Sequence, residues 1–470
     1  MSQNREQWGS KIGFILAASG SAVGIGNIWK YPSIAGENGG GAFTIVYLAC
    51  ILIVGLSIVV AEFVIGRKTQ LSPVGAFEQL APKTNWKWVG YLGVAAAFVI
   101  LSFYGVVGGW ILKYIIDSVS GGFIELSGNT KAAEATFNSF ITSTLSPLIY
   151  QIIFMGLCIF VIIKGVKGGI EKWSKIMMPL IVVLLGALAI RGMTLDGGMA
   201  GISFLFNPRF EDLTASAIVL ALGHSFFTVS LGMGTMITYG SYLNKKQNLV
   251  TSALWVIFLD TAIALLAGVA IFTTVFALGA DPAQGPGLIF VILPSIFPQI
   301  AGGTVWATMF FVLLFMAALT SAISILEVVT AYFIDQKGWS RKKATVQFGG
   351  IITIVGVFCS LSLGAEVIDG NGQDVGHGIN LTGFLGMSFF DFMDKLSAKY
   401  MLPIGGMLTA IFILKKWGLT NYMSELKIGM DKMDLSSLLV RALLTISASI
   451  VAFIIFNEIY FQITGKALIG

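Results

Sequence analysis

The feature that most constrains this chain is a glycine-rich break inside its first long apolar stretch. Residues 20–27 read GSAVGIGN and interrupt residues 11–36, which are otherwise long and apolar enough to cross a membrane as one helix. Each glycine costs roughly 1 kcal/mol in a helix relative to alanine. Backbone groups released by such a break find no partner in hydrocarbon, so the break must line a cavity or a bound ligand.

A second break of the same kind lies in the second half of the chain. Residues 230–234 read SLGMG and fall inside the apolar stretch 215–240. A single break could be a helix kink packed against a neighbour. Paired, glycine-interrupted segments in two halves of a chain instead indicate a substrate site between inverted repeats.

The composition places this chain in a lipid bilayer. Hydrophobic residues make up 56% of it, charged residues only 11%, and the mean hydropathy is +0.86, whereas soluble domains carry about 25% charged residues. The net charge of +5 does not indicate a nucleic-acid partner, because the basic residues flank apolar segments. The three cysteines lie in apolar runs and are expected to be packing residues without a disulfide.

The hydropathy pattern predicts an all-α, multi-pass membrane protein with about eleven spans, since a span needs about 20 mostly apolar residues. The candidate spans are residues 11–36, 41–67, 88–119, 147–165, 171–192, 215–240, 248–278, 303–335, 343–363, 388–415 and 437–462.

The distribution of basic residues predicts the orientation of these spans. Most of the 29 lysines and arginines fall on one side if the N-terminus is cytoplasmic, which places the C-terminus outside. Spans one to five (about 11–192) and six to ten (about 215–415) then form two repeats of opposite topology within one transporter domain, residues 1–470. The last span, about 437–462, lies outside the repeats. The segments 120–146 and 364–382 are expected to be peripheral, the latter as a flexible cap.

The first break offers binding groups of both polarities. Carbonyls near Gly20, Ala22 and Val23 attract cations, while N–H groups near Gly24 and Gly26 attract anions. A zwitterion together with alkali cations would satisfy both. The sequence FFTVS at 226–230 adds an aromatic wall and hydroxyls, and AALTS at 317–321 adds two more hydroxyls. Either motif alone would usually be packing, because membrane Ser and Thr mostly bond helices together.

Ionisable side chains at membrane depth are functional candidates by default, because burying them is costly. Glu62 and Glu327 could equally tie helices together, and Asp260 needs a partner or a nearby cation. The full set is Lys30, Glu62, His224, Asp260, Glu327 and Asp394.

Four motifs show a family resemblance: GSAVGIGNIWKYP, ENGGGAF, FFTVSLGMGTMITYGSY and ALTSAISILE. Through them the chain resembles the bacterial branch of the neurotransmitter:sodium symporter family over nearly its whole length. The resemblance implies the LeuT fold, a 5+5 inverted repeat with broken helices 1 and 6. It also implies sodium-coupled amino acid uptake across a bacterial plasma membrane. Many members have twelve spans, whereas eleven are expected here.

The resemblance also implies site residues, position by position. Two sodium ions are expected. The first would be held by the substrate carboxylate with Ala22, Asn27, Thr228 and Asp260, and the second by Gly20, Val23, Ala317, Thr320 and Ser321. Tyr104 would bond the carboxylate. The substrate pocket would comprise Ser21, Ala22, Gly24, Gly26, Ile100, Tyr104, Phe227, Thr228, Ser230, Met233, Ser321 and Ile325. The outer gate would be Lys30 with Asp394, and the inner gate Arg5 with Asp335, near Trp8, Ser241 and Tyr242.

Departures from the family pattern sharpen these expectations. Lys30 replaces the usual Arg, His224 replaces Gln, and Asp260 replaces an Asn that is common in relatives; its carboxylate would remove the need for chloride. Monoamine carriers have an acidic residue at the position of Gly24, so glycine favours a whole amino acid as substrate. Because Phe227, Ile100, Met233 and Ile325 would make the pocket apolar, a large apolar or aromatic L-amino acid (Trp, Tyr, Phe or Leu) is expected.

Other readings stay open at this point. A proton-coupled carrier of the same fold and a transport-derived channel or sensor are both compatible with the spans. An intramembrane enzyme is disfavoured, since neither HExxH nor a plausible serine–histidine pair is present. The sodium stoichiometry, the exact substrate, proton counter-transport and the oligomeric state are not determined by these residues.

Overall fold

The computed structural model describes residues 5–283, 285, 287–364, 386–430 and 435–464, and regular structure in these ranges is helical throughout. Nine helices there are long and apolar enough to cross a membrane, and a bent pair makes ten. The pair consists of α1 (Lys11–Ala22) and the segment Gly26–Glu37, formed by η1 (Gly26–Lys30) and α2 (Tyr31–Glu37). Its halves meet at 52°, at the predicted first break.

The sixth span is broken as well. It consists of α11 (Ala215–Thr228) and α12 (Thr235–Gly240), each too short to cross alone. Between them Ser230, Gly232 and Gly234 have φ angles of 53°, 77° and 75°, a left-handed region that glycine adopts without steric cost. Nine spans, the α1–α2 pair and this α11–α12 pair together give the predicted eleven, with breaks in the first and the sixth.

The remaining spans agree with the predicted ranges to within a few residues. They are α3–η2–α4 (Gly41–Cys50, Ile51–Gly55, Leu56–Thr69), α6 (Lys87–Val119), α8 (Ser146–Ile163), η4–α9 (Val166–Glu171, Lys172–Met193), α13 (Leu249–Ala277), α15 (Gly303–Lys337), α16 (Arg341–Ser362), α18–η8–α19–η9 (Phe389–Lys395, Leu396–Met401, Leu402–Ile411, Phe412–Trp417) and α21 (Ser437–Thr464).

Short helices occupy connections for which the sequence predicted no helix. One of them, α7, lies in the 120–146 segment that was expected to be peripheral. The predicted cap at 364–382 falls outside the described residues except for residue 364. The short helices are α5 (Pro73–Leu80), α7 (Thr130–Thr142), α10 (Met199–Phe206), η6–α14 (Leu288–Ile292, Leu293–Ile296) and α20 (Leu419–Leu426).

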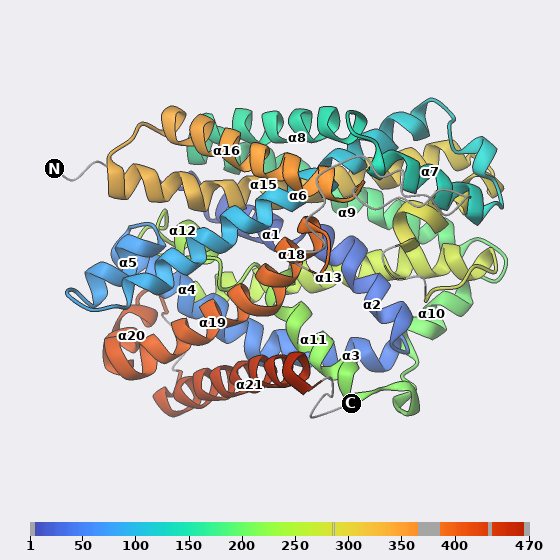
Figure 1. Cartoon of the computed structure of the whole chain (residues 1–470). Helices are drawn as coiled ribbons and strands as arrows, with labels where there is room; N and C mark the ends of the chain where they lie inside the picture. Colours follow the sequence, from blue (N-terminus) through green and yellow to red (C-terminus); the bar gives the residue numbers. More distant parts are fainter. Residues whose placement is uncertain (1–4, 284, 286, 365–385, 431–434, 465–470) are drawn as a thin grey trace.

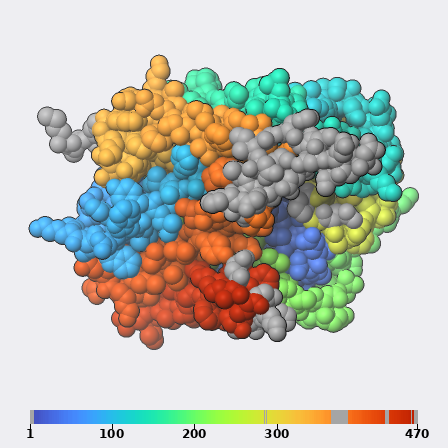
Figure 2. Space-filling view, viewed as in Figure 1, coloured from blue at the N-terminus to red at the C-terminus, as the bar shows by residue number. Residues whose placement is uncertain are grey.

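Helices α6 and α15 form the centre of the bundle. Their most apolar windows are 78% and 83% buried inside the protein, against 28% for α21. In Figure 1, α21 accordingly runs along one edge, and α8 and α16 lie along the opposite edge. The space-filling view shows residues of the α5–α6 region beside the later helix α19, which packs on α6 (Figure 2). Cys50, Cys158 and Cys359 are all buried and free, as expected.

The two ends of the bundle differ in which short helices they carry. Helices α5, α12 and α20 gather at one end, which we call the Arg5 end, and α7 and α10 lie at the other, which we call the Lys30 end (Figure 1).

Candidate functional site at the two broken helices

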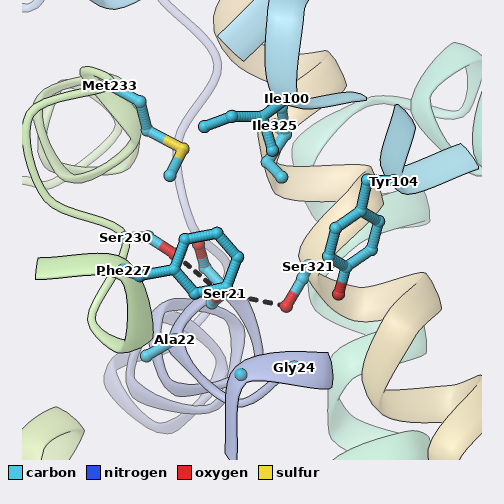
Figure 3. A pocket seen from close by; sticks show the side chains of 11 residues that line it. Ser21, Ala22, Gly24, Ile100, Tyr104, Phe227, Ser230, Met233, Ser321 and Ile325 are labelled. Atoms are coloured by element: carbon cyan, nitrogen blue, oxygen red, sulfur yellow. Dashed lines mark hydrogen bonds between the residues drawn. The ribbon is translucent and has the colours of Figure 1, made fainter. Parts of the chain in front are cut away.

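Both breaks open onto one small cavity of about 20 Å³ between α6 and α15. All of its lining residues belong to the predicted pocket set, and of that set only Thr228 lies outside the lining. Figure 3 shows these side chains converging from the regions of the first and second breaks and from α6 and α15. They are Ser21, Ala22, Gly24, Gly26, Ile100, Tyr104, Phe227, Ser230, Met233, Ser321 and Ile325.

One side of this cavity is polar. The Ser321 hydroxyl donates toward the carbonyls of Ser21 and Val23, at 3.1 and 3.2 Å. Ser230 donates to the Ser21 carbonyl at 2.8 Å, so that carbonyl links the two breaks. The backbone N–H of Ile25 donates to the Tyr104 hydroxyl at 3.3 Å. The first break therefore presents carbonyls and an N–H group within a few ångströms of each other.

Gly24 is required by space alone. A Cβ atom at this position would lie 2.4 Å from the Ser321 hydroxyl oxygen and 2.9 Å from that of Tyr104. Neither separation is compatible with a side chain, so an acidic residue would not fit here without rearrangement of both hydroxyls.

The other side of the cavity is apolar. In Figure 3 the side chains of Met233 and Ile100 point toward each other across one end of the cavity, and Ile325 lies beside Ile100. The Phe227 ring would be only 3.2 Å from a Cβ atom added at Gly26, so it packs directly on the first break. A ligand with one polar end and one apolar end matches this division.

Asp260 is the centre of a buried polar cluster next to the first break. Its side chain is 0% exposed, and its Oδ1 accepts hydrogen bonds from Asn27 Nδ2 at 2.7 Å and Thr228 Oγ1 at 3.2 Å. Asn27 in turn accepts from the Gly24 N–H at 3.1 Å. Within the described residues no Lys or Arg pairs with Asp260. A carboxylate surrounded only by neutral groups suits a bound cation, because an uncompensated buried charge is costly.

The second predicted cation set meets where α1 crosses α15. Thr320 Oγ1 donates to the Ala317 carbonyl at 2.9 Å, and Ser321 donates to the Val23 carbonyl. A Cβ atom at Gly20 would lie 3.3 Å from the Thr320 Cβ, which shows how closely the two helices approach. The hydroxyl and carbonyl groups of this set are neutral oxygen ligands, the type that hard cations prefer.

At the Lys30 end, the predicted pair of Lys30 and Asp394 is formed, with a nitrogen–oxygen distance of 3.0 Å. The Lys30 ammonium also lies 4.3 Å from the centre of the Phe227 ring. A larger cavity of about 500 Å³ lies beside this pair and shares Tyr104 and Phe227 with the small one. These two aromatic side chains therefore separate the two cavities.

At the Arg5 end, the predicted pair of Arg5 and Asp335 is also formed. Arg5 donates to the Ser241 hydroxyl at 2.6 Å, and its guanidinium lies 4.6 Å from the Tyr242 ring centre. The Trp8 indole donates to the Tyr239 carbonyl at 3.0 Å. The segment before α1 therefore packs on this end of the bundle, and these contacts hold it close to the end of α12.

The buried side chains of Glu62 and Glu327 connect neighbouring segments through hydrogen bonds and an ion pair. Glu62 accepts a hydrogen bond from the Gly232 N–H at 2.8 Å and so holds the second break against α4. Glu327 is paired with both nitrogens of the Arg341 fork, at 2.6 and 3.0 Å, and accepts from Tyr242 at 2.5 Å. Sequence analysis left this structural reading open for both residues.

The surroundings of two ionisable groups were not predicted from the sequence. Arg67 and Glu425 form a buried ion pair, at 2.8 Å, between residues too far apart in the chain for any spacing rule to connect them. His224 was noted only as an ionisable candidate and a departure from Gln. Its ring packs 5.3 Å from that of Tyr47, and its Nε2 has no hydrogen-bond partner within the described residues.

Comparison with known proteins agrees with this architecture. A model of the sodium:neurotransmitter symporter family matches residues 5–140 and 137–467. The crystal structure of MhsT in complex with L-phenylalanine superposes with a TM-score of 0.85 at 44% identity, covering 96% of this chain and 99% of that one.

Curated relatives give the same assignment. YhdH of Bacillus subtilis, described as an uncharacterized sodium-dependent transporter, is 40% identical over 428 residues, 91% of each chain. A protein with the same description from Haemophilus influenzae is 36% identical over 423 residues, 87% of this chain and 89% of its own. The chain therefore belongs to the sodium:neurotransmitter symporter family, as a sodium-dependent multi-pass membrane transporter and not an enzyme.

Proposed function

We propose that this protein imports a large apolar or aromatic L-amino acid together with sodium by alternating access. The observation that carries this proposal is the division of the small cavity into a polar side at the first break and an apolar side at Ile100, Met233 and Ile325. MhsT, to which the chain is 44% identical, has been crystallised with L-phenylalanine, a molecule of that shape and polarity.

In this proposal the amino acid carboxylate faces Tyr104 near Gly24, a position at which Ser321 and Tyr104 leave no room for a side chain. It completes the first sodium site with Ala22, Asn27, Thr228 and Asp260. The second sodium ion is held by Gly20, Val23, Ala317, Thr320 and Ser321. Because the carboxylate contacts both ion and protein, sodium and substrate each raise the affinity for the other.

The Asp260 carboxylate also bears on chloride. It supplies a fixed negative charge beside the first sodium ion, inside a cluster that is otherwise neutral. We infer that transport does not need chloride as a counter-charge. Uptake that depends on chloride would count against this role.

The two ion pairs serve as gates. With a cytoplasmic N-terminus in a bacterial plasma membrane, Arg5 and Asp335 form the inner gate, and Lys30 and Asp394 form the outer gate above Phe227. Both pairs are closed here, with the 500 Å³ cavity on the outer side of Phe227. The arrangement corresponds to a state in which both gates are closed.

The charge movement is sufficient to drive accumulation. If two sodium ions enter with one zwitterion, two charges cross, and a potential of 100 mV supplies about 2 × 2.3, or roughly 4.6 kcal/mol. The sodium gradient adds to this. A carrier coupled to protons alone would not need the neutral oxygens of Thr320 and Ser321.

Uptake into proteoliposomes tests the proposal. Labelled Trp, Tyr, Phe, Leu and Ala are offered with external sodium or with potassium in its place. We expect sodium-dependent accumulation of the amino acids with large side chains, and the lowest uptake for Ala. Equal uptake in potassium would overturn the ion-site assignments and favour proton coupling, and a preference for Ala would overturn the pocket assignment.

A further inference from the structure

The end of α4 carries the most completely buried positive charge in the described part of the chain. Arg67 is 0% exposed and donates to the Glu425 carboxylate at 2.8 Å, to the Gln247 carbonyl at 2.7 Å and to the Ile428 carbonyl at 3.2 Å. It also donates to the Glu425 carbonyl. These acceptors belong to the loop before α13 and to the end of α20, so one guanidinium joins three segments.

The residues after Arg67 extend this junction. Gln70, in the left-handed conformation that ends α4, donates to the Leu243 carbonyl at 2.9 Å. The backbone N–H of Ser72 donates to Asp335 Oδ2 at 2.6 Å. We call residues 67–72 the α4–α5 connector. Through Gln70 and Arg67 it contacts both ends of the loop 243–247. Through Ser72 it contacts Asp335.

Each of these contacts lies next to a component of the inner gate. The loop 243–247 follows directly on Ser241 and Tyr242, which contact Arg5, and Asp335 is the partner of Arg5 itself. Immediately before Arg67, a Cβ atom at Gly66 would lie 2.1 Å from the Ile237 carbonyl of α12. The backbone of α4 therefore lies directly against the cytoplasmic half of the second broken helix.

We propose that Arg67, with Glu425 as its counter-ion, is a positioning residue for the inner gate. It fixes the α4–α5 connector and α20 against the loop 243–247, so that Asp335, Ser241 and Tyr242 stay placed to receive Arg5. This inference rests on the proposed function, because it presumes that the Arg5–Asp335 pair closes the inner side.

A lysine cannot take over this role. Its single ammonium offers three donors from one point, whereas the planar guanidinium presents five N–H groups in a fixed fork. The acceptors of Arg67 lie in different directions, on α20 and on the loop before α13. Arg67→Lys therefore keeps the charge beside Glu425 but loses the link between segments, and the inner gate opens more often.

Hydrogen–deuterium exchange of the full-length protein in lipid nanodiscs, with sodium and L-phenylalanine present, measures that opening. Arg67→Lys is compared with Lys68→Ala as the matched control, since Lys68 is 46% exposed and lies 3.6 Å from the same glutamate. Glu425→Gln is a second variant, which keeps every backbone acceptor but leaves the buried guanidinium without its counter-ion. Arg5→Ala is the reference for an inner gate opened directly.

We expect Arg67→Lys to raise exchange about tenfold in peptides from α1 and α12, and Glu425→Gln to raise it as well, because both variants lose hydrogen bonds of a charged group. Peptides from α8 and α16 and the Lys68→Ala protein should match the parent. The positioning role would be overturned if hydrogen–deuterium exchange of α1 and α12 were unchanged in Arg67→Lys, or if exchange rose equally in all helices. Either result counts only if Arg5→Ala still raises exchange of α1. Failure of Arg5→Ala to expose α1 would instead overturn the gate assignment under the proposed function.

Discussion

Replacing Gly24 by alanine tests how tightly the first break is built around its ligands. The added methyl would lie 2.4 Å from Ser321 Oγ and 2.9 Å from Tyr104 Oη. Both separations are below the 3.0 Å that Cβ atoms keep from other heavy atoms. Ser321 must therefore leave the carbonyls of Ser21 and Val23, to which it is bonded.

The magnitude follows from packing energetics. Forcing extra methyl groups into a filled site typically destabilises it by about 1–3 kcal/mol, and we expect a cost in that range here. Because roughly 1.4 kcal/mol is a tenfold change in an equilibrium constant, the loss of substrate affinity should be about 5-fold to about 150-fold. The sodium affinity should fall with it, since Ser321 also belongs to the proposed second sodium site.

Equilibrium binding of labelled L-phenylalanine to purified protein, as a function of sodium concentration, measures both effects. Gly186→Ala is the matched control: a Cβ atom there meets no other atom within 4 Å, in the middle of α9. Thermal melting of both variants shows whether either has lost its fold. A Gly24→Ala protein that melts normally and binds phenylalanine as tightly as Gly186→Ala would refute the reasoning.

Three further changes have defined outcomes. Asp260→Asn removes the fixed negative charge and should lower sodium affinity at least about tenfold, with partial recovery in high chloride; sodium binding that is unchanged and indifferent to chloride would contradict the assignment. Met233→Phe replaces a flexible side chain by a rigid ring and should reduce Trp uptake relative to Leu uptake, so an unaltered Trp:Leu ratio would exclude Met233 as a size determinant. Arg341→Gln leaves the buried Glu327 without its counter-ion and should cost about 3–5 kcal/mol of stability, seen as earlier thermal melting, whereas Arg209→Gln, in an exposed pair, should melt like the parent.

The sequence predicted the spans and the two breaks, because both follow from local patterns. Hydropathy sets the ends of a span such as α6 to within a residue or two. The glycines of the two breaks are visible without any knowledge of the fold, and the positive φ angles at Gly232 and Gly234 give the physical reason for them.

The resemblance brought together residues that no spacing rule connects. Tyr104 in the middle of α6 and Ile325 in α15 would pass as ordinary core positions, yet both line the small cavity. The pairs Lys30–Asp394 and Arg5–Asp335 likewise join distant parts of the chain.

The rest could not be found from the sequence, for a physical reason. Whether a charged residue pairs with another depends on tertiary packing, and neither Arg67 nor Glu425 carries a local signal of its partner. Short helices such as α5 and α20 form because they pack against the bundle, since isolated helices of this length are not stable in water.

The central claim is that one cluster at the two breaks holds both the amino acid and a sodium ion. The most direct test is to measure the sodium dissociation constant of the purified protein with and without saturating L-phenylalanine, and the phenylalanine dissociation constant with and without saturating sodium. The account predicts that each ligand strengthens the other by the same factor, as linkage requires. Sodium binding that is independent of phenylalanine would contradict it.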